Sequence, residues 1–475
     1  MIAVSVMSFF RLLIFSLATL TLSACVRFDL DQSLSEANSA SAEFIQGELV
    51  LQQTDQQKQA ASKRAEEILA QVLDQPAAIE LALVNSPSLQ QLLANHWANS
   101  SSVALSGGIP NPVFEFSRLT SDSELEIERL LSIGLLDLIR YPMLRERAKF
   151  GLEKNQLKLT SDITELVTQI RTAWVSAVVA KQQASYAEQV FSSAEASAEL
   201  AIQMQAIGNF NAINRARQQA FYADAATGLA ASRHNALAKR EALVRLLGLN
   251  RLQARALKLP ERLPDLPDEP IPVGTVSNAA IETRLDVAMA AAELKSATRQ
   301  QGIELVASVT DIEIAGVRDS VWDDGDRETI TGFELEVELP LFRNFNQIRN
   351  RLNASSLAAG NALEQVVRSA NSHLSESYSA YRTSYDIAKH YRDEIVPLQQ
   401  LVSEENVLNY NGMIIGVFEL LEDSRKQIQT VQASIDATGQ FWMADASLRA
   451  SMTGKPTTMQ VMMADSSGGD EEAGH

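Results

Sequence analysis

The sequence contains a single cysteine, Cys25, among its 475 residues. One cysteine cannot form an intramolecular disulfide, so a disulfide-stapled fold is excluded. Aromatic residues are also scarce, at 6% of the chain, although hydrophobic residues make up 46%. A chain with few aromatics and frequent Ala, Ser and Gln suits long helices that pack closely through small side chains.

Long apolar runs, basic patches and catalytic motifs are lacking as well. Beyond the first residues, no apolar run reaches the roughly 18 residues that a helical membrane span requires, so only strands could cross a membrane. The formal net charge of -18 argues against nucleic acid as a partner, because a phosphate backbone would be repelled. The motifs Gly-x-Ser-x-Gly and His-Glu-x-x-His and phosphate-binding glycine loops are absent, so we predict neither an enzyme nor a bound cofactor.

The N-terminus has the pattern of an export signal. An apolar stretch from Leu12 to Leu20 follows Arg11 and ends at Leu22-Ser23-Ala24-Cys25. This stretch is too short for an anchor helix and indicates a removable signal. The last four residues resemble a bacterial lipobox, which implies cleavage before Cys25, a diacylglycerol on its sulfur and an acyl chain such as palmitate on the new N-terminus. The alternative is an incidental cysteine in an ordinary signal peptide.

Composition divides the chain into six segments. They are a signal peptide (1–24), a polar lipidated arm (25–76), a first repeat (77–259), a proline-rich linker (260–275), a second repeat (276–454) and a disordered acidic tail (455–475). Each repeat has the same predicted order of elements: a helix, a pair of short strands, and a long helical hairpin that turns at a glycine.

The predicted helices are unusually long. In the first repeat a helix is expected over 77–104, followed after the strands by a hairpin that begins at Met143 and turns at Gly208. In the second, the hairpin begins at Ile348 and turns at Gly412. About 64 helical residues would extend for roughly 100 Å. Such a helix is either a coiled coil or the wall of a tube, and neither repeat could bury itself alone, so the function is expected to arise between chains.

Four candidate strands alternate apolar and acidic residues. The apolar positions are Phe114, Phe116, Leu125, Ile127, Leu131, Ile133, Ile312, Ile314, Phe333, Leu335, Val337 and Leu339. The acidic positions are Glu115, Glu124, Glu126, Glu128, Asp311, Glu313, Glu334, Glu336 and Glu338. A row of carboxylates opposite an apolar row is typical of a transmembrane barrel with lipid outside and water inside. Arg129 interrupts the apolar row of the second strand, and a solvated amphipathic hairpin is the alternative interpretation.

Several short motifs follow one another in order along the two repeats. They are Ala82-Leu83-Val84-Asn85-Ser86-Pro87-Ser88-Leu89, Arg284-Leu285-Asp286, Leu339-Pro340-Leu341-Phe342, and Tyr410-Asn411-Gly412 with Glu419-Leu420-Leu421-Glu422. With these motifs the mature chain resembles the TolC-like outer-membrane factor family. Leu285 stands where that family usually has proline, and Arg343-Asn344-Phe345 replaces a glycine-containing turn.

The resemblance implies a fold that is mainly α with a small transmembrane β part. Three protomers would form a 12-stranded β-barrel continued by a periplasmic α-helical barrel. The resemblance also implies a lipid-anchored outer-membrane exit duct of a tripartite efflux or secretion system, passive, opened by a periplasmic adaptor and driven by an inner-membrane transporter. The alternative is an envelope-spanning coiled-coil lipoprotein that does not conduct.

The exported substrate stays open between drugs and other compounds, including copper-type cations. Soft ligands occur near the C-terminus, at Met452, Met459, Met462, Met463 and His475. Thioether and imidazole groups suit Cu(I), but the segment lacks a fixed scaffold, so no metal site is predicted.

The resemblance also implies which residues control the periplasmic end of the tube. A spacing of three places Glu419 and Glu422 on one face of a helix, and threefold symmetry would make a ring of six carboxylates. Arg215 and Arg217 occupy the comparable region of the first repeat and are expected to pair with these acids in a closed state. Gly208 and Gly412 are expected at the tips that face the adaptor. The alternatives are solvated glutamates and simple helix termination.

Overall fold

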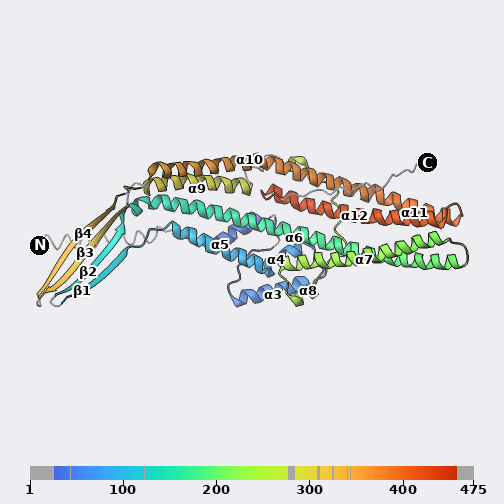
Figure 1. The fold of residues 1–475 in the computed structure, drawn as a ribbon, viewed down its shortest axis with the longest axis horizontal. Helices are drawn as coiled ribbons and strands as arrows, with labels where there is room; N and C mark the ends of the chain where they lie inside the picture. Colours follow the sequence, from blue (N-terminus) through green and yellow to red (C-terminus); the bar gives the residue numbers. More distant parts are fainter. Residues whose placement is uncertain are drawn as a thin grey trace. The chain divides into compact units, whose positions relative to one another are not determined.

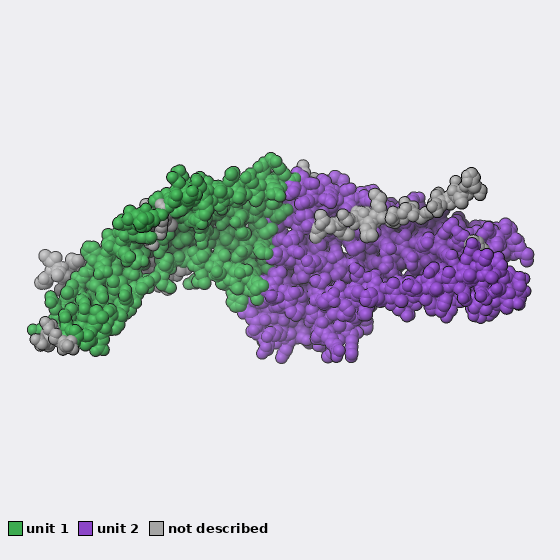
Figure 2. Space-filling view, viewed as in Figure 1, with its two compact units in different colours: residues 1–33, 94–159, 286–368 green, residues 34–93, 160–285, 369–475 purple. Residues whose placement is uncertain are grey.

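The structure is a computed structural model that describes residues 26–42, 44–45, 47–121, 124–276, 284–307, 311–323, 326–339, 341–342 and 344–456. Predictions for the signal peptide, Cys25, Met459, Met462, Met463 and His475 lie outside the described residues. The chain divides into two compact units (Figure 2). Unit 1 comprises 1–33, 94–159 and 286–368, and unit 2 comprises 34–93, 160–285 and 369–475.

The element order repeats along the chain, as the sequence predicts (Figure 1). The first copy contains α5 (Pro87–Ser106), β1 (Val113–Thr120), β2 (Glu124–Gly134), α6 (Leu135–Ala206) and α7 (Ala212–Leu247). The second contains α9 (Leu285–Ala307), β3 (Asp311–Asp323), β4 (Asp326–Glu338), α10 (Phe345–His390), a π-helical turn η3 (Tyr391–Ile395), α11 (Val396–Asn411) and α12 (Val417–Met452). Shorter elements are α2 (Leu30–Ser41), α3 (Asp55–Leu69), α4 (Gln75–Asn85), α8 (Arg251–Ala256) and the 3-10 turn η1 (Val273–Val276).

Proline explains two differences from the expected helices. The single helix predicted over 77–104 is wrong: α4 and α5 are separate, because Ser86, which precedes Pro87, takes an extended backbone with ψ 117°. The long hairpin of the second repeat is likewise interrupted at η3, just before Pro397. A proline near the start of α11 cannot donate to the preceding turn, and the wider π turn accommodates this loss. By contrast, α6 continues through Pro142 and starts eight residues earlier than predicted.

Unit 1 contains the antiparallel sheet, in the order β1-β2-β3-β4, nearly all of α9, and parts of α5, α6 and α10. In this unit α9 is tied to both long helices. Arg299 pairs with Glu146 of α6 at 2.8 Å, and the Gln301 side chain donates to Asn353 of α10 at 2.7 Å. The strands therefore continue into a group of laterally connected helices.

Unit 2 has an apolar core along α6, centred on Trp174. This indole is 2% exposed and donates to the Leu73 carbonyl at 2.9 Å. Leu73 itself is fully buried, and its N–H donates to the Lys258 carbonyl. Buried Ile170 and Val178 flank the indole by one turn of α6 on either side. The residues between α3 and α4 are thus fixed to the chain that follows α8.

The two family-like motifs that precede α5 and α9 have the same structural role. Asn85 donates from its amide to the carbonyls of Leu247 and Gly248, at 3.2 and 3.0 Å, where α7 ends. Arg284, which is 1% exposed, donates to the Ser451 carbonyl at 2.8 Å, near the end of α12. Each motif satisfies carbonyls that the end of a helix leaves unpaired. The two copies therefore share a further feature: in each, a polar side chain near the start of one helix binds carbonyls at the end of another.

The proline-rich linker is held by aromatic side chains of α10 and α12. The Tyr381 hydroxyl accepts from Ile271 N–H at 3.1 Å, and the Tyr385 hydroxyl donates to the Asp268 carbonyl at 2.8 Å. Trp442 donates to the Pro264 carbonyl at 3.1 Å. Both tyrosine rings contact the Phe441 ring, whose centroid lies 5.5 and 5.7 Å away. Met452, named above as a soft ligand, packs against this cluster instead.

Candidate functional site

The pairing of the strands separates charges by sign. In an antiparallel pair, residues directly opposite each other project to the same face. The register joins Glu128 to Asp319, Glu313 to Glu336, and Asp311 to Glu338. By register, all nine predicted acids occupy positions of one face, which we call the acidic face. Three further carboxylates lie on it: Asp319, Asp326 and Glu328.

The opposite face combines an apolar region with arginines, and we call it the outer face. Near the helices it carries Phe114, Phe116, Leu131, Ile133, Ile312, Ile314, Phe333, Leu335 and Val337. Toward the hairpin ends it carries Arg118, Arg129, Arg318 and Arg327. Among the described strand residues, no carboxylate falls on this face. The acidic face in turn has no lysine or arginine within the same strands.

Both edges of the sheet are open within the chain. Strand β1 pairs only with β2, and β4 pairs only with β3, among the described residues. Each edge presents a row of unpaired N–H and C=O groups that can bind a further strand. The helices of the described ranges include none long and apolar enough to cross a membrane.

The helical hairpins turn at the same end of unit 2 (Figure 1). After α6, Gly208 has a φ of +80°, and Asn209 N–H donates to the Met204 carbonyl at 2.9 Å. After α11, Gly412 has a right-handed φ of -78°, and the left-handed residue is Met413 with a φ of 58°. Both hairpins therefore turn at the predicted glycine, but in the second the left-handed conformation belongs to Met413.

The two turns expose apolar side chains. Met413 is 93% exposed and Ile414 is 75% exposed, and Ile207 and Ile213 of the first turn are also exposed. A left-handed methionine costs backbone energy that glycine would not. Exposed apolar side chains therefore occur at both turns, and one turn has a left-handed residue other than glycine.

Glu419 and Glu422 lie one turn apart on α12, and both are exposed. Glu419 accepts a hydrogen bond from Gly416 N–H at 3.2 Å and so satisfies one donor at the start of α12. The next residue, Asp423, is buried and accepts from the Gln399 amide of α11 at 2.8 Å. The two predicted gate acids are thus exposed, while the neighbouring Asp423 fixes α12 to α11.

Arg215 and Arg217 lie in the first turns of α7 and are both exposed. Arg215 makes no ion pair with a described residue. The carbonyl of Arg217 accepts a hydrogen bond from Nη2 of Arg425, an α12 residue, at 3.4 Å. Of the two predicted arginines, Arg217 therefore contacts α12, through its carbonyl and Arg425, a residue that the sequence did not point to.

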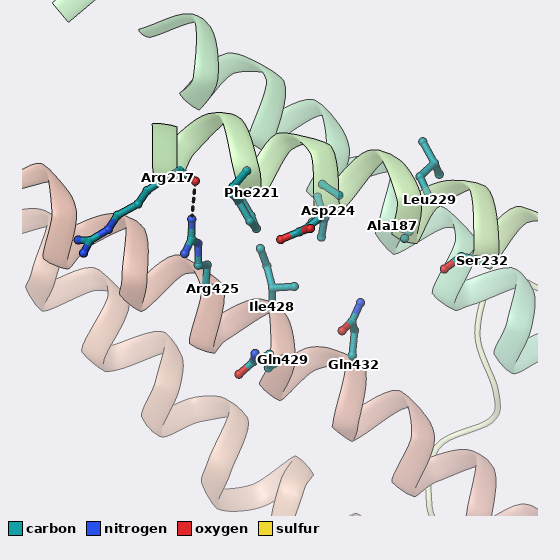
Figure 3. Close-up of a pocket in the computed structure, with 14 residues that line it drawn as sticks. Ala187, Arg217, Phe221, Asp224, Leu229, Ser232, Arg425, Ile428, Gln429 and Gln432 are labelled. Carbon is teal, nitrogen blue, oxygen red and sulfur yellow. Dashed lines mark hydrogen bonds between the residues drawn. The ribbon is translucent and has the colours of Figure 1, made fainter. Parts of the chain in front are cut away.

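A cavity of about 470 Å³ separates α7 from α12 behind this contact (Figure 3). We call it the tip cavity; its lining includes Arg217, Phe221, Asp224, Arg425, Gln429 and Gln432. The Arg425 guanidinium carbon lies 4.5 Å from the centre of the Phe221 ring. This stacking is the main contact that Arg425 makes across the cavity. Arg425 follows Glu422 by three residues, and this spacing on one helix face was the available signal.

Solved structures with a similar fold are outer-membrane channels. The Campylobacter jejuni CmeC outer membrane channel is 12% identical, with 83% of this chain and 86% of that chain covered and a TM-score of 0.70. The outer membrane protein VceC of Vibrio cholerae is 14% identical, with 82% and 96% covered and a TM-score of 0.67. The Neisseria gonorrhoeae MtrE outer membrane channel in its open state is 17% identical, with 84% and 91% covered and a TM-score of 0.62.

Neither a protein-family model nor a curated protein matches the sequence. The described residues contain no group of three or more His, Cys, Asp or Glu that could hold a metal ion. The resemblance inferred from the short motifs is confirmed by these structural neighbours. This chain has the fold of the TolC-family outer-membrane efflux channels.

Proposed function

We propose that this protein is a trimeric exit duct of the outer membrane that serves an efflux or secretion system. Transport through it is passive. A periplasmic adaptor opens the helical end, and an inner-membrane transporter supplies the energy. Acyl chains on Cys25 add a second attachment to the lipid. The fold of the neighbouring channels supports this assignment.

The main support for the proposal is the four-stranded sheet, in which acidic and apolar residues lie on opposite faces and the edge strands β1 and β4 have no further partner within the described chain. Exposed apolar residues on the outer face, such as Phe114 and Phe333, would contact hydrocarbon, and the acidic face would line water. Unpaired backbone groups at the edges cost several kcal/mol each in hydrocarbon. Four strands cannot close alone, so three copies would pair β1 of one protomer with β4 of the next in a 12-stranded barrel.

Opening is proposed to occur at the helical tips. Glu419 and Glu422 of three copies would form a ring of carboxylates, and Arg215 and Arg217 would lie close to it in the closed arrangement. The stacking of Arg425 on Phe221 joins the two hairpins of one chain. An adaptor that binds the exposed Met413 region better in the open arrangement would shift the population toward it.

Two measurements on the full-length protein test this proposal: its mass in detergent and its conductance in planar bilayers. Native mass spectrometry is expected to find three chains, and the reconstituted trimer is expected to conduct. Cation preference is expected at low salt, because carboxylates line the proposed lumen. A folded monomer, or a trimer that never conducts, would identify the non-conducting tether as the correct interpretation.

A further inference from the structure

The four arginines of the outer face have no carboxylate partner among the described strand residues of that face. The side chains of Arg118, Arg129 and Arg318 form no hydrogen bond or ion pair with another described residue. Arg129 and Arg318 are directly opposite each other on β2 and β3, so their positive charges reinforce each other. Arg327 rests over Trp322, with its guanidinium carbon 5.0 Å from the ring centre.

Their position along the strands matches the upper part of a membrane-spanning band. Thr331 is the β4 residue paired with Arg318, and Val337 near the helices lies six positions further along the strand. Six residues rise about 20 Å along a strand, or roughly 15 Å in height at a tilt near 40°. Arg327 lies about 10 Å higher by the same reasoning, close to the roughly 25 Å height of an outward apolar band.

An unpaired arginine inside that band is costly, by about 2–4 kcal/mol near the midplane. Its side chain can reach upward, but it still requires a counter-ion. The neighbouring protomer of the proposed trimer cannot provide one from its strands, because its outer face also lacks carboxylates. With no carboxylate on this face among the described strand residues, the surrounding lipid is a source of the negative charge.

We infer that the outer face binds a phosphorylated glycolipid of the outer leaflet, of the lipid A type. The inference rests on the proposed function, because it requires this face to contact lipid. Arginine presents a planar fork of donors that matches phosphate oxygens, and the Arg129–Arg318 pair together with Arg118 forms a cluster of such donors. The exposed Phe114 and Phe116 continue from this cluster toward the helices and would contact the acyl chains.

This arrangement favours a lipid over a free anion. An ion-binding site would need arginines alone, whereas here the arginines border a contiguous exposed apolar surface that includes Leu131 and Phe333. The aromatic Trp322 beside Arg327 marks the level at which aromatic girdles meet headgroups in outer-membrane barrels. A lipid would need both its phosphate groups and its acyl chains to bind here, whereas a free anion would need only the arginines. An experiment can distinguish these two cases.

The experiment measures lipid A bound to the full-length trimer in detergent by native mass spectrometry. Arg129→Gln/Arg318→Gln is compared with Arg251→Gln/Arg255→Gln, a double change in α8 that removes the same charge from residues with exposed side chains. The concentration for half occupancy is expected to rise by about tenfold or more in the first variant, which is ~1.4 kcal/mol, and to stay unchanged in the control. Equal affinity in wild type and first variant, or equal loss in both variants, overturns the inference.

Three further arms identify the ligand and guard against misfolding. Dephosphorylated lipid A is expected to bind weakly to the wild type, and inorganic phosphate is expected not to compete; competition by phosphate alone would replace the lipid by a free anion and overturn the inference. Arg129→Lys/Arg318→Lys keeps both charges and is expected to retain more binding than the glutamine pair. Three chains in each spectrum confirm assembly, whereas single chains in the wild type would refute the proposed function itself.

Discussion

Replacing Arg425 with alanine is expected to loosen the closed tip. In the structure its guanidinium stacks on Phe221 at 4.5 Å and donates to the Arg217 carbonyl at 3.4 Å. The stacking of a half-buried arginine on an aromatic ring contributes about 0.5–2 kcal/mol, and the long hydrogen bond adds little. If opening separates α7 from α12, a loss of about 1.4 kcal/mol would raise the ratio of open to closed tips by about tenfold.

Single-channel recording in planar bilayers measures this ratio as open probability. Lys426→Ala, at the next position of α12, is the matched control, because it removes one exposed positive charge without touching Phe221. A double-mutant cycle with Phe221→Ala is expected to give a coupling energy close to the loss in Arg425→Ala. Strictly additive effects of the two substitutions, or an open probability equal to that of Lys426→Ala, would refute the role of this contact.

The remaining predictions concern the anchor, the gate and the aromatic cluster. Cys25→Ser is expected to abolish incorporation of radiolabelled fatty acid while trimers still assemble; labelling that persists would refute the lipobox. Glu419→Gln/Glu422→Gln keeps a side-chain oxygen for Gly416 N–H but removes the charges, so block by multivalent cations is expected to weaken without loss of trimer stability; unchanged block would return both residues to a solvated surface. Burial raises the pKa of the Tyr381 hydroxyl, so the folded state keeps its proton at a pH where the unfolded chain loses it. Stability from this group is therefore complete below pH ~10 and falls as the pH rises above that value, and Tyr381→Phe is expected to flatten the alkaline decline in melting temperature while costing about 1 kcal/mol at neutral pH. An alkaline decline of the same slope in Tyr381→Phe would show that other groups cause it.

The alternation of residues along each strand predicted which residues share a face of the sheet, but it did not predict which residues pair with each other on neighbouring strands. Alternation along a strand has a period of two, so the shared face of Glu334, Glu336 and Glu338 follows from the sequence alone. The partner of Arg129 does not, because β2 and β3 are separated in the chain by the whole first helical hairpin. From the sequence alone, Arg129 is an interruption of the apolar row of its strand. Its pairing with Arg318 makes it part of a cluster of arginines.

The same limit applies to the helical end. The break before Pro87 was readable from local chemistry, since the residue before a proline is pushed out of the helical region. Met413 was not, because glycine is the usual left-handed residue and Gly412 stood next to it. The contact of Arg425 with the Arg217 carbonyl spans 208 positions of the chain, so only the folded arrangement of the two hairpins could reveal it.

The way in which the proline-rich linker is held has a consequence for how this protein can change over evolutionary time. Tyr385 and Trp442 bind main-chain carbonyls of the linker, which every amino acid carries, and Tyr381 binds the N–H of Ile271, which every amino acid except proline carries. Substitutions in the linker can therefore accumulate with little loss of attachment, whereas each of the three aromatic residues must keep its polar atom. Two duplicated halves joined in this way can diverge in length and sequence at their junction while the helices beneath stay in register.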